Sequence, residues 1–220
     1  MPRSVVIYTS AATLSALRES IRLRFGHERT KPYTLSYDQK TDAGKGRLRL
    51  CELVDDALLP MISDLVAKGE ATFAGPSDRD VGSRSYEELL EDADRRRRVA
   101  LLQFSTPVIV EVSGAPVPFP VMSAIFEGYV SALRAFSSVA IPSGFEGLRH
   151  VSMTGFKVSC VVTPFGPGAQ GWVRLEMDKG RTEAEIALFN GLIDFAFFCG
   201  SGLHTEEGLG QTRRMEQRQG

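Results

Sequence analysis

The feature that most constrains the fold is an order of strands and helices that occurs twice along the chain. Residues 4–9 are apolar and β-branched, which is typical of a strand. Apolar side chains then recur at steps of three and four over residues 11–25, which predicts an amphipathic helix. We expect Gly26 to end this helix in the left-handed conformation. The remaining elements of this half are a strand or loop at 27–36, a strand at 47–53, a helix that begins near Asp55 and Asp56 and ends at Gly69, and a strand at 70–74.

The second half repeats this order without visible sequence identity to the first. Its expected elements are strands at 99–104 and 108–112, a helix over 122–136, a hairpin of 151–163 with 171–177, and a helix over 183–198. Strand-helix-strand-strand-helix-strand is the ferredoxin-like order. The fold class predicted is therefore α+β, with two tandem ferredoxin-like domains. We expect the first domain at residues 1–84, a linker at 85–98 and the second domain at 99–220.

Composition favours a soluble globular protein. Hydrophobic residues make up 43% and charged residues 24% of the 220 residues. The longest apolar run, 187–199, is too short to cross a bilayer and is interrupted by polar residues, so no membrane association is expected. The first ten residues do not resemble a secretory signal. Three cysteines without a CxxC pair favour a reducing compartment, and we expect a cytoplasmic protein.

Charge is clustered along the chain although the net charge is only −1. The segment 18–31 carries five basic residues against two acidic ones, residues 95–98 are four consecutive arginines, and the tail holds Arg213, Arg214 and Arg218. The local potential decides where a polyanion binds, so near-neutrality does not exclude RNA as a partner. The run 95–98 follows acidic residues at i,i+4 spacing, which favours a solvated helix end over a contact with RNA. Arg47 and Arg49 alternate along one strand face, which fits either an exposed face or a track for phosphates.

The most specific stretch is the glycine-rich segment Gly200–Gly210, which follows a helix directly. Its four glycines are Gly200, Gly202, Gly208 and Gly210. The spacing matches neither the dinucleotide fingerprint nor the P-loop. Glycines at this density allow the backbone to approach a phosphate or another backbone closely. From spacing alone, a plain turn between a helix and an edge strand explains the segment equally well.

Three stretches in the expected order resemble the Cas6 family of CRISPR RNA-processing endoribonucleases, which belongs to the RAMP superfamily. LIDFAFFCGSGLHTEEGLGQTR is similar to the glycine-rich loop near the C-terminus of that family. LLQFSTPVIVEVSGAPVPFPVMSAIFEGYVSALRAF is similar to the start of its second domain, and FGHERTKPYTLSYDQ to the segment after its first helix. Together the matches extend over about residues 10 to 215.

The resemblance implies tandem ferredoxin-like domains and metal-independent cleavage within a CRISPR repeat RNA. The substrate's own 2′-hydroxyl would attack the phosphate and leave a 2′,3′-cyclic phosphate and a 5′-hydroxyl. A group that titrates near neutral pH and a cation beside the phosphorane are sufficient for this reaction. His27 fits the first role and Lys31 the second, with Arg29 and Arg24 as helpers.

Some members of the family carry a further catalytic tyrosine on the first helix. The helix 11–25 has none, so a third catalytic residue is either missing or supplied by Tyr8, Tyr33 or Tyr37. His204, inside the glycine-rich segment, is the rival to His27 as the catalytic histidine.

The resemblance also implies contacts to RNA. They are assigned to Arg29, Gly200, Gly202, His204, Gly208, Gly210, Arg213 and Arg214. No cofactor and no metal site are expected.

CRISPR repeat RNA is the expected partner, other Cas effector subunits are candidate partners, and a homodimer stays open. Two alternatives also remain: a non-catalytic RAMP subunit that only holds RNA, and a ligand-sensing regulator built on ferredoxin-like repeats.

Overall fold

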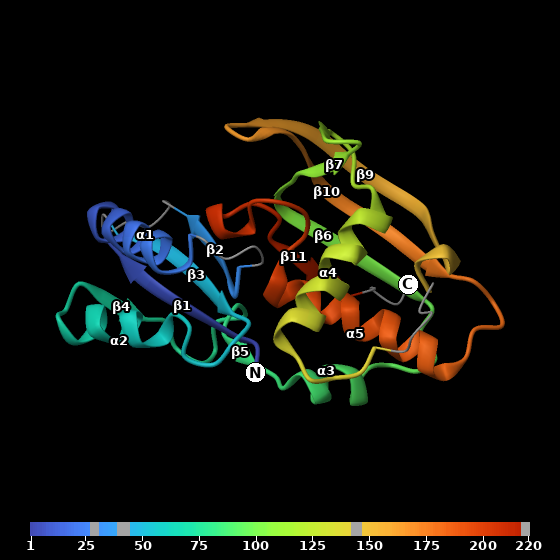
Figure 1. Ribbon diagram of the computed structural model, residues 1–220, viewed down its shortest axis with the longest axis horizontal. Coiled ribbons are helices and arrows are strands. Elements are labelled where there is room, and N and C mark those ends of the chain that lie inside the picture. The colour runs from blue at the N-terminus through green and yellow to red at the C-terminus, as the bar shows by residue number, and fades with distance from the viewer. Residues whose placement is uncertain (27–30, 39–44, 142–146, 217–220) are drawn as a thin grey trace. The chain divides into compact units, whose positions relative to one another are not determined.

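The chain forms two compact units, which Figure 1 shows as ribbons. The computed structural model describes residues 1–26, 31–38, 45–141 and 147–216. Residues 1–84 together with 206–208 make up the first unit, and residues 85–205 with 209–220 the second. No helix of the described ranges is long and apolar enough to cross a membrane.

The first unit is an antiparallel sheet with two helices packed against it. Its strands lie in the order β2-β3-β1-β4, with β5 paired to β1. This arrangement confirms the predicted ferredoxin-like order for the first half. The elements are β1 (Arg3–Thr9), α1 (Ala11–Phe25), β2 (Tyr33–Asp38), β3 (Gly46–Glu52), α2 (Leu59–Ala67), β4 (Ala71–Phe73) and β5 (Gly82–Ser83).

Helix α1 begins and ends through specific polar contacts. The Ser10 side chain accepts a hydrogen bond from the amide of Thr13 at 3.1 Å, which satisfies one open donor of the first turn. Gly26 at the other end has φ −58°, so it stays right-handed and the expected left-handed cap is wrong. Between these ends, Leu17 and Ile21 are buried in one core with Leu48 and Ile62.

The two arginines of β3 serve the first unit itself. Arg47 makes ion pairs with Asp78 at 2.7 Å and Asp80 at 2.8 Å, and Arg49, 5% exposed, donates to the Ser4 hydroxyl. Burial opposes ionisation of Asp78, but hydrogen bonds from the Asp80 amide and from Arg47 outweigh it and lower the Asp78 pKa. The alternation of Arg47 and Arg49 predicted either an exposed face or a track for phosphates. The structure shows neither of these, because both side chains bond within the unit.

The second unit has the same topology. Its sheet order is β11-β6-β10-β9, and Figure 1 shows α4 and α5 lying over one face of it. An additional hairpin, β7–β8, follows β6. The elements are α3 (Tyr86–Glu91), β6 (Val99–Val108), β7 (Val110–Val112), β8 (Ala115–Val117), α4 (Met122–Phe136), β9 (Val151–Thr163), β10 (Gly166–Met177), α5 (Glu183–Cys199) and β11 (Thr212–Arg214), with short 3-10 turns at Gly147–His150 and Thr205–Glu207. The fold class is therefore α+β with tandem ferredoxin-like domains, as predicted.

Residues 85–98, the predicted linker, lie within the second unit. Helix α3 packs on α5, with the rings of Tyr86 and Phe195 5.7 Å apart. The helix ends at Glu91, so it is shorter than the acid-arginine spacing suggested. Asp94 instead accepts hydrogen bonds from the amides of Arg96 and Arg97, which lower its pKa.

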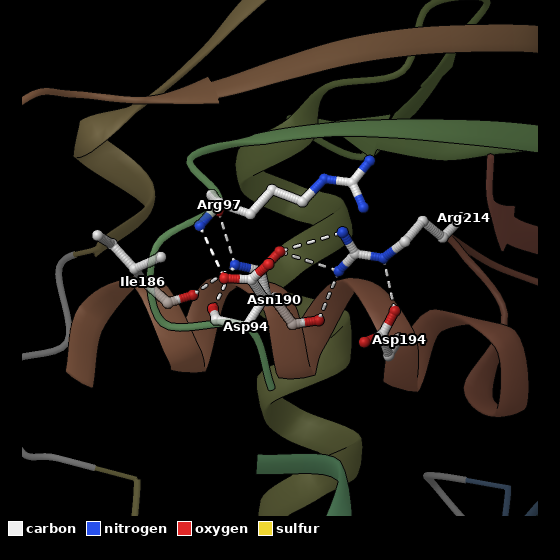
Figure 2. Close-up of polar contacts among 6 residues, drawn as sticks. All are labelled: Asp94, Arg97, Ile186, Asn190, Asp194 and Arg214. Carbon is white, nitrogen blue, oxygen red and sulfur yellow. Dashed lines mark hydrogen bonds and ion pairs between the residues drawn. The ribbon is translucent and has the colours of Figure 1, made fainter. Parts of the chain in front are cut away.

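A fully buried asparagine joins this segment to α5. The side-chain nitrogen of Asn190 lies 2.8 Å from the carbonyl oxygens of Asp94 and Arg97 and 2.9 Å from that of Ile186 (Figure 2). Its side-chain oxygen accepts from the Arg214 guanidinium. A buried polar group that loses its partner costs free energy, so Asn190 fixes the path of residues 94–97 against the helix.

Replacing Asn190 tests this arrangement. Asn190→Leu keeps the side-chain size but leaves buried carbonyls without a donor, and we expect the free energy of unfolding to fall by about 3 kcal/mol. Urea unfolding measures it. Ser131→Ala on the exposed face of α4 is the control, with an expected change within about 0.5 kcal/mol. A loss for Asn190→Leu no larger than for the control would contradict the assignment.

Candidate functional site

Lys31 lies at the end of helix α1. Its ammonium donates to the carbonyl oxygens of Phe25 at 2.8 Å and Gly26 at 3.0 Å, where a cation is favoured by the helix dipole. His27 and Arg29, two further residues of the predicted site, lie outside the described residues. The lysine therefore holds a defined position next to the predicted catalytic segment.

The first unit contains a pocket of about 380 Å³ beside the end of α1. The Arg18 side chain contributes a buried Nε without a hydrogen-bond partner among the described residues. Its Nη2 donates to the Glu207 carbonyl at 3.1 Å. Three basic and three acidic side chains line the pocket, so it is polar and of mixed charge. The lining residues are Ser15, Arg18, Glu19, Ile21, Arg22, Gly26, Lys31, Tyr33, Leu35, Glu206 and Glu207.

Tyr33 is the one of the three candidate tyrosines that lines this pocket. Burial, reinforced by Glu206 and Glu207, raises the pKa of its phenol to about 12. Tyr33 is therefore protonated at neutral pH and suits hydrogen-bond donation rather than proton abstraction. Tyr8 is half-buried in β1, and the Tyr37 ring packs directly over Gly46.

The glycine-rich segment Gly200–Gly210 is a compact loop rather than an open turn. All four of its glycines have positive φ, between 66° and 94°. A Cβ atom on Gly202 would lie 2.2 Å from the Ile109 carbonyl oxygen, and one on Gly210 would lie 2.0 Å from that of Ser201. Leu203 donates to Ile109 and Gly210 to Pro107, so the loop is bonded to the end of β6. Glycine at these positions is required by close packing of backbone on backbone.

A chain of hydrogen-bonded hydroxyl groups connects this loop to the core. The Tyr129 phenol lies 2.5 Å from the Ser201 hydroxyl, which lies 2.6 Å from the Thr212 hydroxyl. Thr212 in turn donates to the Gly210 carbonyl. Burial raises the pKa of Tyr129, so its proton stays available for the hydrogen bond. The helical spacing of Tyr129 identified it as core, but no sequence signal showed that its hydroxyl reaches the loop.

His204 lies in the same loop and is partly exposed. Its backbone adopts φ 61°, a left-handed conformation that is uncommon for residues other than glycine. The imidazole is stacked on the Phe165 ring, with centroids 4.2 Å apart and planes 19° apart. Sequence reasoning identified His204 but missed Phe165. The third histidine, His150, lies 3.4 Å from Asp178 and is not among the residues that line the pocket beside α1.

The two arginines after the loop differ in their surroundings. Arg214 makes an ion pair with Asp194 at 2.6 Å and hydrogen bonds to the side-chain and backbone oxygens of Asn190 (Figure 2). These contacts favour a structural role for Arg214 over the predicted contact with RNA. Successive residues of a strand face opposite sides, so Arg213 points away from α5.

The described residues contain no group of three or more His, Cys, Asp or Glu side chains placed to hold a metal ion. Within the same part of the chain Cys51, Cys160 and Cys199 form no disulfide, and Cys51 and Cys199 are buried.

Comparison with known proteins identifies the family. The family model described as CRISPR-associated endoribonuclease Cas6 matches residues 102–212, which is just over half of the chain and includes the whole glycine-rich loop. The chain belongs to the Cas6 family. It is thus a member of an endoribonuclease family, as its sequence motifs indicated. No curated protein sequence matches it significantly.

Solved Cas6 structures share the fold along the whole chain. The product complex of the Cas6 protein TTHA0078 superposes with a TM-score of 0.80 at 18% identity and covers 98% of this chain and 99% of that one. The product complex of TTHB231, a Cas6 of Thermus thermophilus, gives 0.77 at 24% identity, with 98% and 99% covered. A partial Cas6-RT-Cas1–Cas2 complex gives 0.63 at 10% identity and covers all of this chain and 47% of that one. At these identities the likeness shows the fold alone.

Removing one hydroxyl tests how the Cas6 loop is held. Tyr129→Phe deletes the phenol but keeps the ring, and we expect a loss of about 1 kcal/mol in the free energy of unfolding. We also expect several-fold faster hydrogen exchange at the amides of Ser201, which donates to the Gly210 carbonyl, and of Gly210, which donates to the Pro107 carbonyl in β6. Tyr8→Phe in the first unit is the control and should leave these amides unchanged. Equal exchange in wild type and Tyr129→Phe would show that the hydroxyl chain does not hold the loop.

Proposed function

We propose that this Cas6 protein cuts precursor CRISPR RNA within its repeats by attack of the 2′-hydroxyl on the adjacent phosphate, without a metal ion. The observation that carries the proposal is the family match, because it spans the glycine-rich loop and the strand that holds it. Product and substrate-mimic complexes of similarly folded Cas6 proteins support RNA as the substrate.

The proposed reaction transfers two protons and exchanges one bond. A base removes the proton of the 2′-hydroxyl, the oxygen attacks phosphorus, and the bond from phosphorus to the 5′-oxygen breaks. The 5′-oxygen leaves with a proton supplied by an acid or by water. The products are a 2′,3′-cyclic phosphate and a 5′-hydroxyl. Cations and hydrogen-bond donors stabilise the charge that gathers on the phosphorane oxygens.

His27 and Lys31 remain our candidates for these roles. Gly26 and Lys31, the described residues on either side of the segment 27–30, both line the polar pocket of the first unit. This supports a proton transfer by His27 at that pocket, since an imidazole titrates near pH 6.5. Lys31 brings the positive charge, with Arg29 beside it in sequence as a helper.

Two further side chains suit the same pocket. The buried Nε of Arg18 lacks a partner among the described residues, and a phosphate oxygen would satisfy it. The neutral phenol of Tyr33 can donate a hydrogen bond to the same group. In this proposal Tyr33 replaces the tyrosine that helix α1 lacks.

The loop Gly200–Gly210, with His204 and Arg213, is proposed to bind the RNA next to the cleaved phosphate. The proposed division of labour places the cleavage chemistry in residues 1–84 and most contacts to the repeat in residues 99–220. Because a similarly folded Cas6 is part of a Cas6-RT-Cas1–Cas2 complex, we also propose that other Cas proteins bind this chain.

Two changes of condition test the mechanism. Purified protein is incubated with labelled repeat RNA from the CRISPR array of the source genome, in EDTA, and in parallel with an RNA carrying one 2′-deoxyribose at the cut site. We expect cleavage to persist in EDTA and to be lost with the deoxy substrate, because the attacking group is then missing. Cleavage of the deoxy substrate at the same bond would contradict attack by the 2′-hydroxyl.

The same assay separates the alternatives. A non-catalytic RAMP subunit would bind the repeat RNA and cut it under no condition. A ligand-sensing regulator would show no salt-dependent affinity for RNA, whereas phosphate contacts make affinity fall with salt.

Two histidine variants test the assignment of the catalytic group. His27→Ala should lower the single-turnover cleavage rate by about a hundred-fold or more while the dissociation constant for repeat RNA stays within about two-fold. His204→Ala should mainly weaken RNA binding. If His204→Ala lowers the rate at saturating protein and His27→Ala does not, the roles are reversed.

A further inference from the structure

The second unit carries a stacked pair of aromatic rings next to the glycine-rich loop. Phe165 contributes the first ring from the turn between β9 and β10, and His204 the second from the loop. Parallel rings with centroids 4.2 Å apart form an offset stack. Phe165 remains 42% exposed despite this contact, so part of this residue is open to solvent.

Both rings are mounted on fixed backbone. The Thr163 hydroxyl accepts from the Phe165 amide at 3.1 Å and donates to the Gly166 carbonyl at 2.8 Å, which closes the turn. On the other side, Leu203 donates to Ile109 at 2.9 Å, and the His204 carbonyl accepts from Leu209. The Phe165 ring is therefore held at the surface by an ordered turn, where it stays partly exposed.

The backbone strain at His204 also indicates a binding site at the stacked rings. Its left-handed backbone conformation costs free energy for any residue with a Cβ atom, and such residues are concentrated at binding sites. In this conformation the imidazole lies against the Phe165 ring. The loop therefore presents this histidine as part of a flat surface.

We propose that the Phe165–His204 stack is a platform for one unpaired nucleobase of the RNA substrate. This rests on the proposed function, since a nucleobase is the flat aromatic group that an RNA offers to a platform beside the loop. Stacking is tolerant of sequence because every base has an aromatic face. It also assigns His204 to binding, so that proton transfer is left to His27.

The second exposed aromatic pair of this unit differs in geometry. Phe119 and Phe156 are 40% and 57% exposed, and their planes meet at 90°. In an edge-to-face pair the ring planes are perpendicular, so a base on one ring would not extend a parallel stack. It therefore provides a control with the same residue type and similar exposure.

Fluorescence of 2-aminopurine tests the platform directly. The base analogue is placed at each position in turn of the repeat RNA, made with a 2′-deoxyribose at the cut site so that it stays intact. At one position we expect quenching on binding that Phe165→Leu abolishes and Phe165→Tyr preserves. Phe165→Leu should also raise the dissociation constant by about ten-fold, in line with the loss of one stacked base. Phe119→Leu should change neither reading.

A second variant separates stacking from proton transfer. His204→Tyr keeps a flat ring but removes the imidazole, so the quenching of 2-aminopurine on binding should be retained, whereas His204→Leu should reduce the quenching and weaken binding. Quenching that is equal in wild type and Phe165→Leu at every position would overturn the platform, as would weakening by Phe119→Leu to the same degree. Thermal unfolding of each variant serves as the control that the fold is retained. Failure of wild type to cut the all-ribose RNA would refute the proposed function and not the stack, because the fluorescence assay needs no cleavage.

Discussion

The close contact of backbone with backbone in the loop Gly200–Gly210 is the constraint on which the second unit's proposed binding surface depends. Gly202 lies against the Ile109 carbonyl and Gly210 against Ser201, at distances that leave no room for a Cβ atom. The hydroxyl chain through Tyr129, Ser201 and Thr212 then fixes the loop to the core. A loop built in this way is ordered before any ligand arrives, so binding does not have to supply the free energy of ordering it.

The positive charge of the chain is used in two distinct ways. Buried Arg49 and partly buried Arg47 and Arg214 bond to acceptors in their own unit, because removing a guanidinium from water is costly unless it is paired and hydrogen-bonded. Arg18 and Lys31 also donate to backbone carbonyls of the first unit, but they line the polar pocket. A count of arginines therefore overstates the positive charge available to RNA, because several of the arginines are bonded within their own unit.

The order of elements could be predicted from the sequence because it depends on local periodicity. Helix 11–25 was expected at the bounds that the structure has, and the buried face expected from Met122 to Phe136 lies on α4, since both apolar stripes are long and regular. The three-residue strand β11 was not predicted, because its pairing with β6 is a tertiary contact that leaves no periodic signal. The partners of Arg47 and Arg214 lie twenty or more residues away, so spacing could not reveal them. In the candidate site, the glycines and His204 were visible as a motif, whereas Phe165 and Tyr129 join it only through the fold.

The chemical form of the new 3′ end is the most direct test of the account. Mass spectrometry of the upstream fragment, from cleavage of a repeat RNA by the purified wild-type protein, distinguishes a cyclic phosphate from a free hydroxyl. Attack by the substrate's own 2′-oxygen predicts a terminal 2′,3′-cyclic phosphate. Its mass is lower than that of the opened monophosphate by one water molecule, about 18 Da. A 3′-hydroxyl with a 5′-phosphate on the downstream fragment would contradict the proposed chemistry, since it requires an external water as nucleophile.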